Sequence, residues 1–238
     1  MNAQNRTLLI LAVAGVAMGT LFFAGAAQAA LITTQSSTAP TTDVLISQTA
    51  SSHTSPWRTE SGLRQVGQSF LVGAGGFVLD KITVNINTLA NSDLDGDSFT
   101  LTINTYTDGT DFTPDSTVST QAGNLPANLS IDFGSGDTYL TFDIDNVTLT
   151  GGQQYGFFLD PTGFSSSTNL LLESMAASSY TSGIGLMHGP AELEVWDPTN
   201  GVQNADLEFY LQEVPEPSTF ALAAFGLLGL IGFGRRRR

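Results

Sequence analysis

Three aspartates around one glycine have the spacing best suited to metal binding in this sequence. Asp93, Asp95 and Asp97 alternate along the chain. This spacing gathers hard carboxylate oxygens on one side of a tight loop, as calcium prefers. The match to a helix-flanked calcium loop is partial, because Ser98 stands at its sixth position and Asn104 at its twelfth. The sequence therefore predicts either a calcium site or a solvated acidic turn.

Two tryptophans are the residues best suited to binding a sugar. Trp57 and Trp196 are the only tryptophans of the chain, and an aromatic ring face suits the C–H surface of a pyranose. The alternative is that both rings pack in a core or at a sheet edge, which is the usual role of tryptophan in a β-sandwich. Both residues are therefore candidate carbohydrate contacts, and their burial decides between the two readings.

Catalytic motifs are missing from the sequence. The two histidines, His53 and His188, lie outside any zinc-protease motif, and neither a serine-hydrolase elbow nor a phosphate-binding glycine loop occurs. Glycan hydrolysis needs a pair of carboxylates, but only Glu173 follows a long apolar run. We therefore expect no enzyme, with a secreted glycan hydrolase as an alternative.

The charge distribution excludes a nucleic-acid binder. Between residues 43 and 213, three basic residues (Arg58, Arg64 and Lys81) face 21 carboxylates, a balance of −18. Such a surface repels phosphate backbones. The chain also has no cysteine, which excludes disulfides, thiol catalysis and Cys-ligated metal sites.

Alternating apolar and polar residues predict strands between residues 44 and 213. Apolar side chains take every second position in several runs, and glycine- or aspartate-rich turns separate these runs. The clearest runs are 82–86, 99–103, 140–144 and 207–211. Half-buried strands joined by short turns favour antiparallel sheets. We expect an all-β fold, a single antiparallel β-sandwich of jelly-roll type, preceded at 30–43 by a flexible arm or the lead into a first strand.

Residues 1–29 have the pattern of a secretory signal. Arg6 precedes an uncharged, mainly apolar stretch of 21 residues, which we expect to form a signal helix. Ala27 and Ala29 then supply the small-x-small pattern that signal peptidase recognises. Cleavage there leaves Ala30 as the new N-terminus. The alternative is an uncleaved membrane anchor, for which the apolar stretch is long enough.

The last 25 residues combine a proline motif, a short apolar segment and a basic cluster. Their sequence runs from the motif Val214, Pro215, Glu216, Pro217 and Ser218 through apolar residues 219–234 to Arg235, Arg236, Arg237 and Arg238. A helix over the apolar segment would be roughly 24 Å long, shorter than the ~30 Å hydrocarbon core. The arginines are held on the cytoplasmic side, so the prolines, which keep the backbone extended, lie outside. We expect a short transmembrane helix that is a poor permanent anchor.

This tail resembles the PEP-CTERM sorting signal over residues 214–238. Such tails occur in Gram-negative bacteria that make extracellular polysaccharide, and exosortase, a membrane-embedded cysteine transpeptidase, recognises them. The resemblance implies processing by exosortase after signal peptidase has acted. It also implies that the tail is held transiently in the inner membrane and that the mature protein reaches the cell surface or the outside.

Residues 60–160 are similar to choice-of-anchor extracellular domains of the R type. The similarity rests on a strand at 67–72, a glycine turn leading into 77–84, and later segments at 140–142, 147–149 and 151–159. These positions are mostly core apolar residues and turn glycines, so the similarity implies a fold and not an activity.

These features together predict an exported, non-enzymatic protein of the cell envelope or extracellular matrix. We expect a structural or adhesive role linked to exopolysaccharide. The alternative is a carbohydrate-binding module that holds matrix polysaccharide through Trp57 or Trp196. The acidic middle keeps the protein soluble and lets divalent cations bridge it to anionic polymers.

Overall fold

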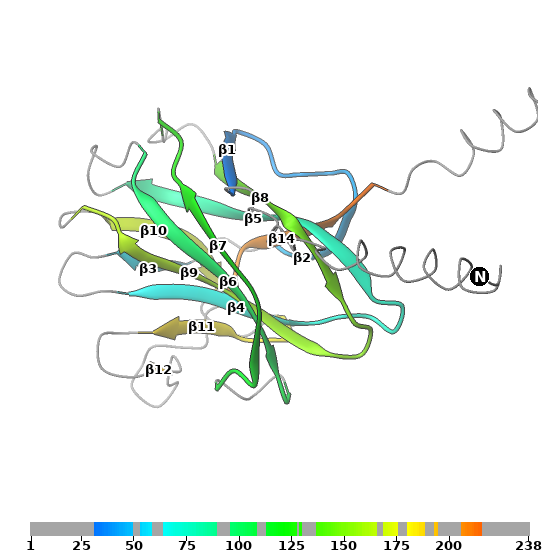
Figure 1. Cartoon of the computed structure of the whole chain (residues 1–238). Coiled ribbons are helices and arrows are strands. Elements are labelled where there is room, and N and C mark those ends of the chain that lie inside the picture. Colours follow the sequence, from blue (N-terminus) through cyan, green and yellow to red (C-terminus); the bar gives the residue numbers. More distant parts are fainter. Residues whose placement is uncertain are drawn as a thin grey trace, which may run out of the picture.

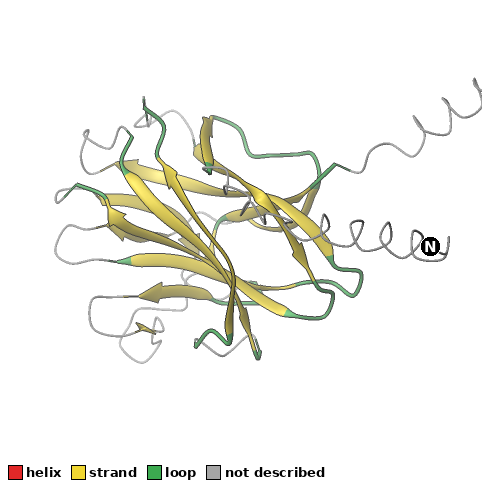
Figure 2. Cartoon of the chain, viewed as in Figure 1, coloured by secondary structure: helices red, strands yellow, loops and turns green. Residues whose placement is uncertain are grey.

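Strands form all the regular secondary structure of the described chain (Figure 2). The computed structural model describes residues 31–49, 53–58, 64–89, 96–108, 113–127, 129, 137–165, 169–175, 180–188, 193–194 and 206–215. These residues contain 14 strands arranged in two antiparallel sheets (Figure 1). The predicted all-β sandwich of two sheets is therefore confirmed, while its jelly-roll connectivity stays a prediction.

The larger sheet has eight strands built around two long central ones. Its members are β1 (Ile32–Ser36), β2 (Val44–Gln48), β3 (His53–Arg58), β5 (Phe77–Leu89), β8 (Thr138–Leu149), β10 (Asn169–Met175), β13 (Asp206–Leu207) and β14 (Phe209–Glu213). β5 pairs with β8 along one side. On its other side β5 pairs first with β14 and then with β10, so β14 lies between β5 and β2.

The smaller sheet has six strands in the order β12-β11-β4-β9-β6-β7. They are β4 (Gln65–Leu71), β6 (Ser98–Tyr106), β7 (Ser116–Asn124), β9 (Gln154–Gly163), β11 (Gly185–His188) and β12 (Leu193–Glu194). Neighbours pair antiparallel throughout. β4 and β9 lie at the middle of this sheet, and β6 follows β9, so outward side chains of these three strands occupy the central part of its outer face.

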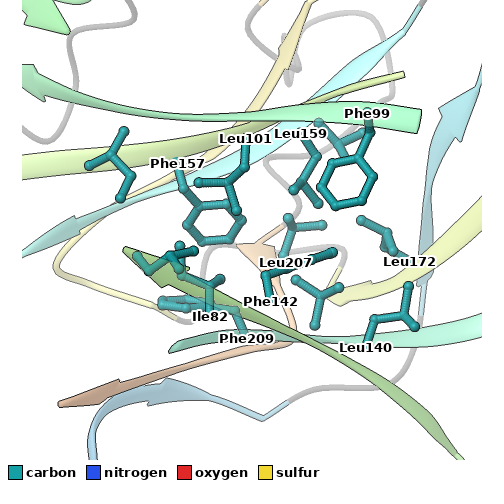
Figure 3. Close-up of a cluster of buried hydrophobic side chains, with 14 of the residues drawn as sticks. Ile82, Phe99, Leu101, Leu140, Phe142, Phe157, Leu159, Leu172, Leu207 and Phe209 are labelled. Atoms are coloured by element: carbon teal, nitrogen blue, oxygen red, sulfur yellow. The ribbon is translucent and has the colours of Figure 1, made fainter. Parts of the chain in front are cut away.

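Apolar side chains of both sheets meet in one core between the layers (Figure 3). Every second residue of the strands points inward, which is the period-two pattern of half-buried strands. The fully buried members include Ile82, Leu101, Leu140, Phe142, Phe157, Leu159 and Phe209. The predicted strands at 82–86, 99–103 and 140–144 are therefore confirmed, together with the faces they bury.

The run at 207–211 is buried on both faces, as is the run at 82–86, where Thr83 and Asn85 are 0% and 1% exposed. Leu207, Phe209 and Leu211 enter the core as predicted, but Glu208 and Tyr210 on the opposite face are also only 5% and 6% exposed. The run is also split, because β13 pairs with β10 and β14 with β5. Alternation reports which side of a strand meets the core, and it carries no information about what covers the other side.

The prediction of a flexible arm at 30–43 is wrong for residues 32–36, which form β1. The sandwich therefore begins before residue 44. β1 pairs with β8 through Ile32↔Asp143 to Ser36↔Tyr139. Leu31, 5% exposed, donates its backbone N–H to Ala122 of β7 at 3.1 Å. Gly123 makes room for this contact, since a Cβ there would lie 2.7 Å from Leu31 Cδ2. Without β1, β8 would be an edge strand whose backbone N–H and C=O groups on that side pair only with water. These groups pair with β1 instead, which orders residues 32–36.

Two glycine-rich turns predicted from the sequence are present. Gly76 has φ +63° and closes the 73–76 turn with a hydrogen bond from its N–H to Gly73 at 3.1 Å. Gly152 has φ +76° in the turn that precedes β9. The signal helix and the transmembrane helix fall outside the described ranges. Within those ranges, no helix has the length and apolar character needed to cross a membrane.

Candidate functional site at the end of strand β14

The proline motif begins directly where β14 ends. β14 is an inner strand, hydrogen-bonded to β2 on one side and β5 on the other. Its residues Phe209 and Leu211 are completely buried. Strands bonded on both sides and filled with apolar side chains are the hardest parts of a sheet to open. The motif is therefore attached to a firmly held element.

In the part of the chain that the structure describes, backbone hydrogen bonds of the last strand continue as far as Val214. The backbone N–H of Glu213 donates to Asp43 at 3.0 Å, and the N–H of Val214 donates to Val78 at 3.0 Å. Asp43 has φ 56°, a left-handed conformation that aspartate tolerates. Pro215 is exposed, and it has no N–H with which to extend the pairing. The remaining motif residues Glu216, Pro217 and Ser218, like the cluster Arg235, Arg236, Arg237 and Arg238, are outside the described part.

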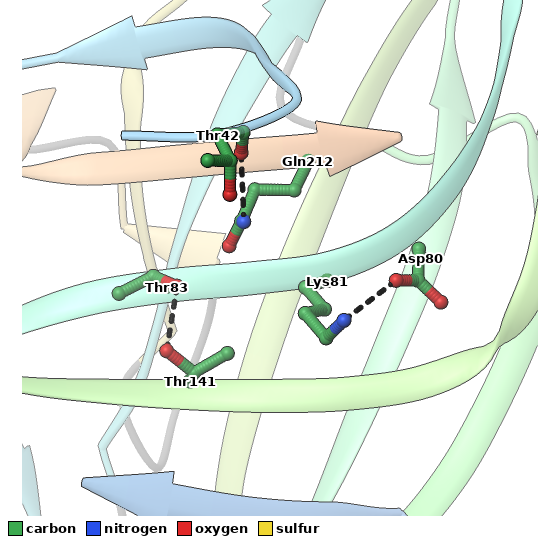
Figure 4. A network of polar contacts seen from close by, with 6 residues as sticks. All are labelled: Thr42, Asp80, Lys81, Thr83, Thr141 and Gln212. Carbon is green, nitrogen blue, oxygen red and sulfur yellow. Dashed lines mark hydrogen bonds and ion pairs between the residues drawn. The ribbon is translucent and has the colours of Figure 1, made fainter. Parts of the chain in front are cut away.

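The outer face of the sheet beside the motif is held by polar contacts (Figure 4). The side-chain amide of Gln212 donates to the carbonyl oxygen of Thr42 at 3.1 Å. Thr83 and Thr141 share a hydrogen bond of 2.8 Å across β5 and β8. Lys81 donates to Asp80 at 2.8 Å, and this hydrogen bond raises the pKa of the lysine ammonium. The Gln212 and Thr83 contacts join separate segments of this sheet, while the Lys81–Asp80 pair lies within β5.

Trp57 cannot serve as a sugar platform. Its side chain is completely buried and packs against Phe99, Phe142 and Phe164 with ring centroids 5.4, 6.4 and 4.6 Å away. The carbohydrate contact expected at Trp57 is therefore wrong, because the ring fills the core between the sheets. Trp196 lies outside the residues that the structure describes, so its predicted role stays open.

Only one member of the acidic loop is described. The Asp97 carboxylate accepts a hydrogen bond from the backbone N–H of Ser165 at 2.9 Å, which ties the loop to the end of β9. Gly96 has φ +78°, as expected for a tight turn, while Asp93 and Asp95 precede the described segment. No group of three His, Cys, Asp or Glu side chains that could hold a metal occurs among the described residues. Calcium binding stays a prediction.

The structure reveals a buried polar cluster that the sequence did not indicate. Glu208 accepts hydrogen bonds from the Tyr210 hydroxyl at 2.8 Å, the Tyr139 hydroxyl at 3.3 Å and the Asn85 amide at 3.1 Å. Burial, followed by the nearby Glu208, raises the pKa of Tyr139. Burial and the hydrogen bond to Glu208 raise that of Tyr210. The cluster links β5, β8 and β14 just before the motif.

A second buried cluster joins the two sheets. Gln68 of β4 donates to Asp206 of β13 at 3.0 Å and accepts from the N–H of Leu207 at 2.9 Å. Asp206 also accepts from the N–H of Tyr180 at 3.0 Å. Burial raises the pKa of Tyr180 to about 12, and the charge of Asp206 adds to it. Both clusters use carboxylates to hold strands together, a role that no sequence motif marks.

Comparison with known proteins identifies the tail. A family model described as PEP-CTERM protein-sorting motif matches residues 213–238. The search of curated proteins finds no match. The matched segment starts at Glu213, the last residue of β14, so the family model and the end of the sandwich meet at the same residue. The chain thus carries a PEP-CTERM sorting signal, which supports its being an exported protein that exosortase sorts.

Proposed function

We propose that the sandwich is a non-enzymatic cargo that is delivered to the cell envelope or extracellular matrix, where it has a structural or adhesive role linked to exopolysaccharide. The observation that carries the proposal is the position of the fold between two processing signals. Among the described residues, the first backbone hydrogen bond is made by Leu31, just after the expected cleavage before Ala30, and the last by Val214. Removal of both signals leaves every described strand in place.

The way the buried acids are used supports a structural role. Glu208 and Asp206 are 5% and 0% exposed and bind donors from neighbouring strands. Carboxylates that are fully hydrogen-bonded by the scaffold hold it rigid. The remaining acidic residues give the exported domain its strong negative charge, which favours solubility outside the cell.

Replacement of the motif tests the sorting step. In a host that carries exosortase, we expect Pro215→Ala/Glu216→Ala to leave the full-length tail in the inner membrane. Mass spectrometry of the chain termini reports whether residues after the motif are removed and whether Ala30 is the first residue. Pro126→Ala, a proline substitution in a loop of the sandwich, serves as the control and should be processed normally. Normal processing of the double variant would show that the motif is not read.

A carbohydrate-binding module is the second candidate. Burial of Trp57 removes one of its two proposed contacts. The observation that favours it is a polar hollow on the outer face of the six-stranded sheet, which neither tryptophan lines.

A further inference from the structure

We infer that the outer face of the six-stranded sheet holds a binding site for a neutral polysaccharide chain. The site is a hollow of about 240 Å³ lined chiefly by Gln65, Thr102, Asn104, Thr117, Phe158 and Asp160. This inference deepens the proposed link to exopolysaccharide and rests on it, because it names the surface and the class of glycan involved. None of these residues was singled out by the sequence.

Three adjacent strands form the floor of the hollow. Gln65 comes from β4, Phe158 and Asp160 from β9, and Thr102 and Asn104 from β6. These strands lie side by side in the order β4-β9-β6-β7 (Figure 1), and Thr117 of β7 is paired with Asn104 of β6. Sites built on strands keep their polar groups in fixed positions, so the hollow is formed before a ligand arrives.

Asn104 supplies a hydrogen-bond donor to the hollow. Its side chain is only 5% exposed, and its carbonyl oxygen accepts a hydrogen bond from the Thr117 hydroxyl at 2.9 Å. Its amide nitrogen has no partner among the described residues, and Asn104 lines the open hollow. The nitrogen can therefore donate to water in the hollow or to a ligand oxygen that replaces this water. The Thr102 hydroxyl, likewise without a described partner, lies beside it on the same strand.

Asp160 supplies an acceptor held in place from both sides. One carboxylate oxygen accepts from the Gln65 amide at 2.7 Å, and the other accepts from the backbone N–H of Thr162 at 2.9 Å and from its hydroxyl. A carboxylate oxygen has room for more than one donor. Sugar hydroxyls are donors and acceptors at once, so one hydroxyl can donate to Asp160 while another accepts from Asn104.

An aromatic ring supplies the apolar part of the floor. Phe158 is 7% exposed and packs on this outer face with Tyr106 and Leu186, away from the main core. Gly156 makes the packing possible, since a Cβ there would lie 2.7 Å from the Tyr106 ring. The small exposed part of this ring gives the hollow an apolar contact next to fixed polar groups, and a pyranose has both C–H groups and hydroxyls to meet them.

The charge of the site selects a neutral glycan. Asp160 is the one charged residue among those that line the hollow in the described part of the chain. The whole chain has a net charge of −14. Like charges repel, so uronate, sulfate and phosphate polymers are disfavoured. The hollow is also smaller than the ~300–1,000 Å³ of pockets that enclose a whole ligand, which fits one sugar unit of a longer chain.

Affinity electrophoresis of the full chain in detergent micelles tests the inference. The probes are three neutral polysaccharides (hydroxyethylcellulose, glucomannan and dextran) and the anionic polygalacturonate. We expect at least one neutral polymer to retard the protein and polygalacturonate to have no effect. Thr102→Val keeps the shape of the side chain and removes its hydroxyl, and Asn104→Ala removes the free amide. Each should weaken binding by about three- to tenfold, as the loss of one hydrogen bond does.

Thr148→Val is the matched control, because Thr148 is an exposed threonine on β8 of the other sheet. It should bind like the unchanged protein. If Asn104→Ala fails to fold, as its thermal unfolding would show, Thr102→Val decides. Absence of retardation by all three neutral polymers, or unchanged binding by Thr102→Val, would overturn the inference. Terminal processing is read separately by mass spectrometry, so loss of glycan binding with normal processing leaves the sorting proposal standing.

Discussion

The backbone amide of Val214 donates to the carbonyl oxygen of Val78 at 3.0 Å, one residue before the exposed Pro215. Within residues 31–215, so far as they are described, it is the last backbone hydrogen bond along the chain. Pro215 cannot form the next one, because proline lacks an N–H. The sorting motif therefore starts where sheet pairing ends, and removal of the tail need not disturb a strand.

Truncation on either side of β14 tests this boundary. A chain that stops after Pro215 should unfold at nearly the same temperature as the full chain, because all strand contacts remain. A chain that stops after Glu208 loses Phe209 and Leu211, both fully buried, at about 2–5 kcal/mol each. That loss approaches the whole stability of a typical domain, so we expect no cooperative unfolding by circular dichroism. Equal melting of the two truncations would contradict the role given to β14.

Substitution of Trp57 measures its contribution to the core. Trp57→Ala should lower the free energy of unfolding by about 3–5 kcal/mol, because it leaves a cavity among three phenylalanines. Trp57→Phe should cost less, since the indole N–H has no partner in the described structure and its loss breaks no hydrogen bond. Urea denaturation gives both values. An unchanged unfolding midpoint for Trp57→Ala would show that the ring is not in the core.

The Glu208 cluster predicts a large difference between two substitutions. Glu208→Ala leaves the hydroxyls of Tyr139 and Tyr210 without their acceptor and should cost about 2–4 kcal/mol. Glu208→Gln keeps one acceptor oxygen and should cost clearly less. Glu213→Ala, a half-buried glutamate at the end of β14, is the control and should have little effect. Chemical denaturation that ranks the three equally would show that the cluster does not stabilise the fold.

Alkaline pH should destabilise the sandwich through Tyr180. Burial raises its pKa to about 12 in the folded state, whereas an unfolded tyrosine titrates near 10. Above pH ~10 the unfolded chain releases this proton more readily, so stability is full below that pH and falls as the pH rises towards 12. Melting temperatures measured across this range should fall more gently for Tyr180→Phe. Parallel curves for the two proteins would rule out this contribution.

Calcium binding by Asp93, Asp95 and Asp97 predicts a melting temperature that rises with added Ca²⁺ and falls with chelator. Asp97→Asn should abolish this response, because it removes one of the carboxylate ligands. Asp115→Asn is the matched control, since Asp115 accepts from Thr107 in a different loop, and the response should persist. A melting temperature that changes with neither Ca²⁺ nor chelator would show that the loop is a solvated acidic turn.

Local patterns in the sequence were sufficient for the clearest strands and for the sorting signal. The alternation at 82–86, 99–103 and 140–144 fixes both the strand conformation and the buried face, since side chains of a strand point to opposite sides in turn. The motif at 214–218 is read as contiguous residues, so its recognition needs no fold. Both properties depend on neighbours in the chain, which the sequence displays directly.

Tertiary structure decided everything that depends on which strands become neighbours. Trp57 is in the core, and Glu208 is buried on the outer side of its strand, because of strands distant in sequence. Asn104 and Asp160 lie in one hollow because β6 pairs with β9. Alternation gives each strand two faces but does not say which partners flank it or what covers its outer side. Those choices follow from the packing of the whole chain.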